Sequence, residues 1–393
     1  MLLNCKTIFS RFLPVFAVVL ILTSEVSAQN NGFSVRTTGH LPFLEYGTGE
    51  DRLGGAKMTF LDTNIILKVV DSFKTKYKVN LSKNLSGYID KQLVLRSEDS
   101  KISNHLTSSW KVYGDSAYDY VTINLDERLP YRSIQQINPS RVVVDIFGVA
   151  SNTNWITQLS TVEEITNSWY EQVEDDVMRV FIELKHPQHW GHSIFFDGNR
   201  LVIRIRRQPQ RLLLSDLVIA VDAGHGGENN GADGGVSKEL EKNYTLLIAQ
   251  ELQKALIQKK ATVVMTREKD TTLSMIERVE FLRQLQPNLL ISIHLNSASN
   301  DTVRGVSTYY RYIGFRPLSQ VILNHMLELG LQEYGNVGNF NFGLSGPTDY
   351  PNCLVEVAFL SNREDELKIL DPKFHKLVAK KIVEGIEEFL KNL

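Results

Sequence analysis

The sequence predicts an α/β domain with a helix-flanked, mostly parallel or mixed sheet, preceded by a β-rich region. Two observations predict this order. Downstream of Leu217, short apolar runs alternate with segments of helical periodicity. Upstream, short segments of alternating apolar and polar residues are separated by turn residues. The 393 residues are enough for two or three domains, and the net charge of −2 gives no basis for a nucleic-acid partner.

Residues 1–28 have the pattern of a secretory signal peptide. Lys6 and Arg11 precede an apolar run at residues 12–22, and the small residues of Val26-Ser27-Ala28 follow it. A membrane-spanning helix needs about 20 apolar residues, so this run is too short for a comfortable span. An uncleaved anchor is the alternative. No other segment is expected to cross a bilayer, so the mature protein should have no transmembrane segment.

Residues 29–105 are expected to form a β-rich domain. Strand patterns at residues 65–70, 77–81 and 87–89 are separated by polar turns. This arrangement resembles a bacterial SH3-type barrel, a common wall-binding accessory. The alternative is an N-terminal extension of the domain that follows.

Residues 112–207 contain an internal duplication. The pattern at residues 121–125 is echoed at residues 180–184, and that at 141–146 is echoed at 200–205, with the same offset of 59 positions. Repeated alternating strands predict a small β-sandwich built from two similar halves, followed by a linker at residues 208–215.

Three histidines in this region recur at every third position. Pro187 and Gly191 argue against a helix that would align them, and the first half of the duplication has no histidine there. We therefore interpret them as solvated turn residues and not as a second metal site. They are His186, His189 and His192.

Residues 216–393 carry the strand and helix alternation. Ser274 and Glu277 form a capping-box pattern, and Asp371-Pro372 is typical of the start of a last helix. Leu247 is expected on the apolar face of the first helix and Leu377 on that of the last. Cys353, the single cysteine left after signal cleavage, is interpreted as a packed, inert thiol.

Polar residues at the ends of the apolar strands suggest a metal site. His225 lies between glycines after the apolar run at residues 217–221, and His294 ends a second apolar run. Glu241 opens the intervening helical segment. Two histidines and one glutamate leave a tetrahedral zinc with one open position, as in hydrolytic sites. Glu356 lies in a third apolar strand, where a carboxylate is costly to bury, and it is the candidate general base or acid.

Several spaced motifs occur together in one order from Leu217 to the C-terminus. They resemble the zinc-dependent N-acetylmuramoyl-L-alanine amidases. The resemblance implies that His225, Glu241 and His294 bind zinc and that Glu356 is the catalytic glutamate. The motifs are Asp222-Ala223-Gly224-His225-Gly226-Gly227, Glu241-Lys242-Asn243, Thr266-Arg267, Ser292-Ile293-His294-Leu295-Asn296 and Glu356-Val357-Ala358-Phe359-Leu360-Ser361-Asn362.

The match to the amidases has two departures and one ambiguity. Ala223 stands where the family usually has proline. The stretch between His294 and Glu356 is too short for the regulatory helix of some division amidases, which puts autoinhibition by such a helix in doubt. Glu239 lies two residues before Glu241, and we interpret it as a solvated carboxylate at a helix start. Family positions are also matched by Arg267, Arg278 and Asn296, to which we assign no catalytic role.

The duplicated region resembles the AMIN domain, which accompanies these amidases in Gram-negative bacteria and binds peptidoglycan. Together the resemblances imply a periplasmic, envelope- or septum-associated enzyme that hydrolyses the amide between N-acetylmuramic acid and L-alanine. Peptidoglycan would be its substrate, Zn²⁺ its cofactor and an activator of the division machinery a further partner. Two alternatives stay open: a non-catalytic peptidoglycan-binding division scaffold, and a zinc peptidase that cuts the stem peptide.

Overall fold

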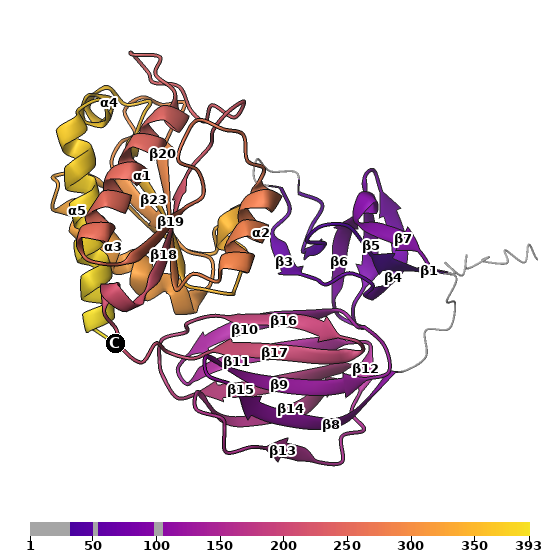
Figure 1. The fold of residues 1–393 in the computed structure, drawn as a ribbon. Coiled ribbons are helices and arrows are strands. Elements are labelled where there is room, and N and C mark those ends of the chain that lie inside the picture. Colours follow the sequence, from indigo (N-terminus) through magenta and orange to yellow (C-terminus); the bar gives the residue numbers. More distant parts are fainter. Residues whose placement is uncertain (1–31, 50–53, 98–104) are drawn as a thin grey trace, which may run out of the picture. The chain divides into compact units, whose positions relative to one another are not determined.

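The computed structural model describes residues 32–49, 54–97 and 105–393. The predicted signal peptide lies outside the described residues. Within them, no helix is both long and apolar enough to cross a membrane. A β-rich N-terminal region and a C-terminal α/β region follow each other along the chain, which confirms the predicted fold class (Figure 1).

The first β-rich segment forms a sheet of its own. Its seven strands have the order β3-β2-β6-β5-β4-β1-β7, and all neighbouring strands are antiparallel. A short 3-10 helix, η1 (Lys91–Leu93), precedes the last strand. The strands are β1 (Phe33–Thr37), β2 (Phe43–Glu45), β3 (Lys57–Phe60), β4 (Ile66–Phe73), β5 (Lys76–Asn80), β6 (Ser86–Asp90) and β7 (Val94–Arg96).

Two further sheets contain the duplicated sequence. One has the order β10-β11-β15-β14, and the other β12-β8-β9-β17-β16, with β13 also paired to β8. The strands are β8 (His105–Gly114), β9 (Tyr118–Leu125), β10 (Tyr131–Ile137), β11 (Ser140–Phe147), β12 (Val149–Ala150), β13 (Ile156–Gln158), β14 (Ile165–Glu174), β15 (Val177–Leu184), β16 (His192–Asp197) and β17 (Arg200–Arg206).

The duplication is visible in the strand register. Val121 on β9 pairs with Ile203 on β17. Their counterparts 59 positions away, Val180 and Val144, pair with each other in the other sheet. Each half of the repeat therefore supplies strands to both sheets, instead of forming one sheet by itself. The repeat in the sequence corresponds to equivalent pairings in the structure.

The histidines near the end of the duplication differ from the sequence-based interpretation. His189 and His192 are buried, not solvated. Burial, with a smaller contribution from His189, lowers the pKa of His192 to about 3, so this side chain stays neutral. The Nε2 atom of His192 lies 2.9 Å from the hydroxyl of Ser133, whereas His186 pairs with Glu164 at 2.6 Å. The three rings thus have separate partners within the sandwich.

The C-terminal region is built on one mixed sheet. Its order is β19-β18-β20-β23-β21-β22, in which β21 runs antiparallel to β23 and the other neighbours are parallel. The four strands β19, β18, β20 and β23 form the parallel part. The strands are β18 (Val218–Ala223), β19 (Thr262–Met265), β20 (Leu289–Asn296), β21 (Val306–Tyr309), β22 (Glu333–Val337) and β23 (Asn352–Phe359).

Helices cover both faces of this sheet (Figure 1). Helix α5 packs against both α1 and α3 over the larger hydrophobic core, and α2 covers a smaller core that includes Leu282 and Tyr350. The helices are α1 (Glu241–Gln258), α2 (Met275–Leu285), α3 (Arg316–Leu327), α4 (Arg363–Ile369) and α5 (Pro372–Lys391). The short 3-10 helices are η2 (Leu214–Asp216), η3 (Ile313–Phe315) and η4 (Gly343–Ser345).

Local signals for the helix starts are confirmed, whereas two predicted core positions are wrong. Ser274 and Glu277 form a capping box at α2, and the Asp371 carboxylate caps α5. However, Leu247 and Leu377 are exposed by 45% and 49%. Each lies beside a fully buried residue of the same helix, Ile248 and Val378 respectively, so the buried stripe is narrower than the apolar pattern suggested.

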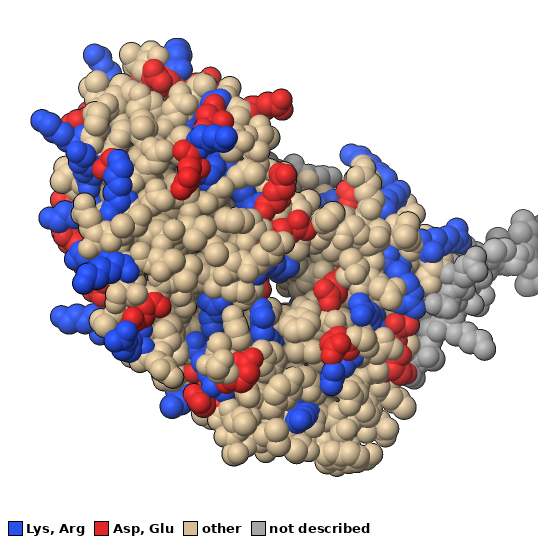
Figure 2. All heavy atoms as spheres, in the orientation of Figure 1, with Lys and Arg blue, Asp and Glu red and all other residues tan. Residues whose placement is uncertain are grey.

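Charge and cysteine placement agree with the composition. Basic and acidic side chains are interspersed on the face shown in Figure 2, which fits a net charge near zero. Cys353 is a buried free cysteine on β23. Burial raises the pKa of its thiol, which keeps it protonated and unreactive.

Candidate metal centre

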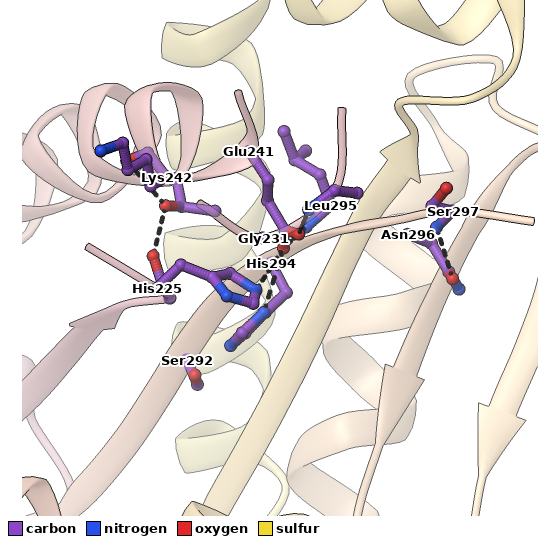
Figure 3. A network of polar contacts seen from close by, with 12 residues as sticks. His225, Gly231, Glu241, Lys242, Ser292, His294, Leu295, Asn296 and Ser297 are labelled. Carbon is purple, nitrogen blue, oxygen red and sulfur yellow. Dashed lines mark hydrogen bonds and ion pairs between the residues drawn. The ribbon is translucent and has the colours of Figure 1, made fainter. Parts of the chain in front are cut away.

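Three predicted ligands converge at the carboxyl ends of the parallel strands. His225 follows β18, His294 lies near the end of β20, and Glu241 is the first residue of α1. One nitrogen or oxygen from each lies within 4.8 Å of the others, and Figure 3 shows the two rings and the carboxylate pointing toward one another. The carboxyl edge of a parallel sheet is where α/β folds place their sites.

The Glu241 carboxylate joins the two rings. Its Oε1 atom lies 3.1 Å from Nε2 of His225 and 3.1 Å from Nδ1 of His294. The backbone amides of Leu295 and Ala232 donate to its two oxygens at 2.9 and 2.8 Å. Glu239, by contrast, is exposed. The structure therefore places Glu241, and not Glu239, between the histidines.

Two glycines leave room for this arrangement. A Cβ on Gly224 would lie 2.4 Å from the ring of His294, and one on Gly231 would lie 2.5 Å from an oxygen of Glu241. Gly231 also has a φ of +72°, a conformation that other residues rarely adopt. The side chains of His294 and Glu241 occupy the space that a larger residue would fill.

The charges at the site favour an ionised carboxylate. Burial raises the pKa of Glu241, but the hydrogen bonds and charges of His225 and His294 outweigh it and hold this pKa well below its usual range. Burial lowers the pKa of His225, but the hydrogen bond and charge of Glu241 outweigh burial and raise it. The Glu241 carboxylate is thus negative. A metal cation would compete with a proton for the ring of His225.

His294 has a ring nitrogen that faces no donor or acceptor. Its Nε2 atom is buried without a hydrogen-bond partner in the described part of the chain. The ring packs edge-on against His225 at 4.9 Å and against Phe342 at 5.3 Å between centroids. The other ring nitrogen, Nδ1, is the one that lies 3.1 Å from Glu241. Two imidazoles and a carboxylate gathered in this way fit the donor set of a zinc site.

Glu356 lies on the neighbouring strand. Its register partner across β20 and β23 is His294, so both side chains emerge on the same face of the sheet. Glu356 is half-buried. The predicted base is therefore next to the candidate ligands, and its catalytic role stays a prediction.

Asp222 is a site residue to which the sequence reasoning gave no role. Its carboxylate is buried on β18 and accepts hydrogen bonds from Ser292 at 2.6 Å, Thr266 at 2.7 Å and Arg278 at 2.5 Å. Burial raises its pKa, but the charge of Arg278, the hydrogen bonds and the charge of His294 outweigh burial and lower it. The sequence signal that could have identified Asp222 is a carboxylate inside an apolar strand, which is the same signal that identified Glu356.

The other matched family positions also lie at this edge. Arg267 and Arg278 are buried and donate to backbone carbonyls next to His225, at Ala223 and Gly224 among others. The side-chain amide of Asn296 instead donates to the hydroxyl of Tyr309 at 3.3 Å, farther along β20 and β21.

Comparison with known families assigns this region. A model described as N-acetylmuramoyl-L-alanine amidase matches residues 219–388. These residues belong to that amidase family. A second model, the AMIN domain, matches residues 110–205. The amidase domain thus contains all four predicted site residues, and the AMIN domain contains the duplicated strands.

The curated relatives and solved structures to which this chain is similar include proteins named as amidases. The probable cell wall amidase LytH of Staphylococcus epidermidis is 32% identical over 180 residues, which are 46% of this chain and 60% of the relative. The chain thus spans about three fifths of the length of that relative. The catalytic domain of the amidase CwlV from Bacillus (Paenibacillus) polymyxa is 34% identical, with 44% of this chain and 98% of that chain covered and a TM-score of 0.43. The amidase AmiC2 of Nostoc punctiforme is 29% identical, with 44% of this chain and 97% of that chain covered and a TM-score of 0.43.

Proposed function

We propose that this protein is a zinc-dependent N-acetylmuramoyl-L-alanine amidase, which hydrolyses the amide between N-acetylmuramic acid and L-alanine in peptidoglycan. The observation that carries the proposal is the convergence of His225, Glu241 and His294 inside a domain of the amidase family. Two imidazoles and a carboxylate leave one position of a tetrahedral zinc open to water or substrate. An open position of this kind is what metal-assisted hydrolysis needs, and this supports the proposal.

The proposed mechanism divides the work between the metal and Glu356. When bound, zinc would polarise the scissile carbonyl and lower the pKa of water toward about 7. Glu356 accepts the proton of the attacking water and transfers it to the leaving amine of L-alanine. Its position beside His294 across β20 and β23 supports this role. Glu241 holds both imidazoles through one oxygen and needs no proton transfer of its own.

We further propose the cellular setting and the domain roles. Residues 1–28 would be a signal peptide that directs the protein to the periplasm of a Gram-negative bacterium, and residues 29–105 a β-rich, SH3-like module. Residues 112–207, which include most of the AMIN match, would target the enzyme to peptidoglycan at the envelope or septum during cell separation. Residues 216–393 would be the catalytic domain.

One solved amidase, CwlD of Clostridioides difficile, is in complex with the GerS lipoprotein. By analogy, we propose that this protein has a protein activator.

The test is mass spectrometry of purified peptidoglycan digested with the mature protein. We expect intact glycan chains and free stem peptides that begin with L-alanine. Glu356→Gln keeps the size of the side chain but removes the base, so the rate should fall about 10²–10⁴-fold. Fragments cut within the stem peptide would instead support a peptidase. Zinc-loaded protein that binds peptidoglycan but releases nothing, even with envelope extract as a source of activator, would support the scaffold.

A further inference from the structure

Arg267 is a buried cation that has no carboxylate partner. Its residue is only 3% exposed, and no carboxylate lies within ion-pair distance of it in the described part of the chain. Its guanidinium instead donates to oxygens of the backbone and to one hydroxyl. The charges of Asp222 and Asp270 act on Arg267 only from beyond ion-pair distance. Burying a charge is costly, so the hydrogen bonds that satisfy the guanidinium indicate what this position requires.

The acceptors of Arg267 flank two of the three predicted ligands. One nitrogen, Nη2, donates to the carbonyl of Gly224 at 2.8 Å and to the carbonyl of Lys242 at 2.7 Å. Gly224 precedes His225, and Lys242 follows Glu241. A single atom therefore connects the loop after β18 to the first turn of α1.

Further bonds make this connection rigid. The Nε atom of Arg267 donates to the carbonyl of Ala223 at 2.9 Å, and Nη2 also reaches the hydroxyl of Thr245 at 3.1 Å. That hydroxyl donates in turn to the carbonyl of Gly224 at 2.7 Å. The planar guanidinium supplies these bonds in a fixed fork, which the single ammonium of lysine cannot reproduce.

The backbone is strained at His225, directly after the carbonyls that Arg267 binds. His225 has a φ of +61°, which is unfavourable for a residue with a Cβ. Arg278 donates to the carbonyl of this same residue at 2.5 Å and to that of Ala223 at 2.9 Å. Arg278 is ion-paired with Asp222, whereas Arg267 is not. Such strain persists only where surrounding contacts fix it.

We propose that Arg267 is a positioning residue for the metal centre, which sets the distance between His225 and Glu241 by binding the backbone beside each. This inference rests on the proposed metal site and adds the group that fixes its geometry. Arg267 is not one of the predicted ligands. The backbone oxygens that it connects account for its position behind them.

The test is the metal affinity and spectrum of Arg267→Lys in the full chain. We expect a roughly 10–100-fold weaker zinc affinity, as is typical when a group behind a metal ligand is lost. The visible absorption of the Co²⁺-loaded protein should also change, because the ligand geometry changes. Neither readout depends on peptidoglycan hydrolysis.

Arg207→Lys is the matched control. Arg207 is also a largely buried guanidinium, and it donates to the carbonyl of Thr161 at 2.7 Å, far from the ligands in sequence. Its substitution should leave zinc affinity and the Co²⁺ spectrum unchanged. If Arg267→Lys does not fold, Thr245→Val removes the hydroxyl from the same network and should weaken zinc binding in the same direction by a smaller factor.

The outcomes separate this inference from the proposed function. Wild-type zinc affinity and an unchanged Co²⁺ spectrum in Arg267→Lys would overturn the positioning role while leaving the zinc site intact. A loss equal to that of Arg207→Lys would also overturn it, because the effect would then be general destabilisation. A wild-type protein that binds no zinc would overturn the proposed metal site and the inference with it.

Discussion

The amidase domain and the AMIN domain both bury carboxylates, but the two domains use them differently. In the AMIN domain, Asp119 is fully buried, pairs with Arg207 at 2.7 Å and accepts three backbone amides. In the amidase domain, Glu241 bridges His225 and His294, and Nε2 of His294 has no partner among the described residues. The Asp119 carboxylate is thus satisfied by an arginine and backbone amides, whereas the Glu241 carboxylate lies between two rings that can bind a metal.

The difference has an energetic reason. The charge of Asp119 is compensated within the chain by Arg207 and three backbone amides, so this carboxylate needs no ligand, and removing it would leave Arg207 buried without its partner. The cluster at Glu241 brings together groups that bind metals, and a cation would complete it. The following predictions test this contrast, from the largest expected effect to the smallest.

The largest effect should come from Glu241→Ala. Without the carboxylate the metal centre loses one ligand and the bridge between two histidines, so zinc affinity should fall by more than the roughly 10–100-fold that outer groups typically contribute. Hydrolysis of peptidoglycan should be lost as well. Chelator competition measures the affinity. Glu239→Ala is the matched control two residues away, and equal losses in both variants would contradict the placement of Glu241.

Asp119→Ala should lower stability without weakening zinc binding. It leaves Arg207 buried without its main anion, which should lower the free energy of unfolding by about 3–5 kcal/mol. Zinc affinity of the folded full chain should stay at the wild-type value. Denaturant unfolding and zinc competition on one preparation provide both quantities. A weakened zinc site with unchanged stability would remove the contrast between the domains.

Zinc affinity should decrease in acid with a slope set by His225. The metal binds the neutral ring, so protons compete with it, and affinity falls by about tenfold per pH unit below the pKa of the metal-free ring. Glu241 raises that pKa above the ordinary 6.5 in spite of burial. As the pH is lowered, zinc affinity should therefore stay constant through the alkaline range and begin to fall before the pH reaches 6.5. A decline that begins only well below this value would show that Glu241 does not raise the pKa.

The smallest effect concerns helix α5, where neighbouring apolar residues differ in burial. Leu377→Ala should change the free energy of unfolding by no more than about 0.5 kcal/mol, because the side chain is exposed. Val378→Ala should cost roughly 1.5–3 kcal/mol, because Val378 is fully buried. Thermal or denaturant unfolding compares them. Equal costs would show that Leu377 is buried in solution.

The sequence predicted the parts of the molecule that depend on local chemistry. The capping box at Ser274, the alternation of strands and helices after Val218, and the fold class follow from short-range patterns, whereas β21, α3 and β22 were not predicted. His225 and His294 could be picked out because polar residues at the ends of apolar strands meet at one edge of a parallel sheet. Glu241 could be preferred to Glu239 only by its place in the motif.

What the sequence could not predict depends on contacts distant along the chain. The repeat indicated two similar halves, but not that β9 pairs with β17 and β11 with β15 across the halves. Burial of His189 depends on the sheet that packs around it. The bridge made by Arg267 joins carbonyls, and backbone oxygens leave no trace in the side-chain pattern.

The most direct test of the central claim is the zinc content of the purified mature protein, before and after treatment with a chelator. The proposed site predicts about one zinc per chain, removed by the chelator and absent from His294→Ala. Removal of this zinc should also stop the release of stem peptides that begin with L-alanine. A wild-type protein that binds no zinc, or a His294→Ala variant that keeps it, would contradict the metal centre at His225, Glu241 and His294.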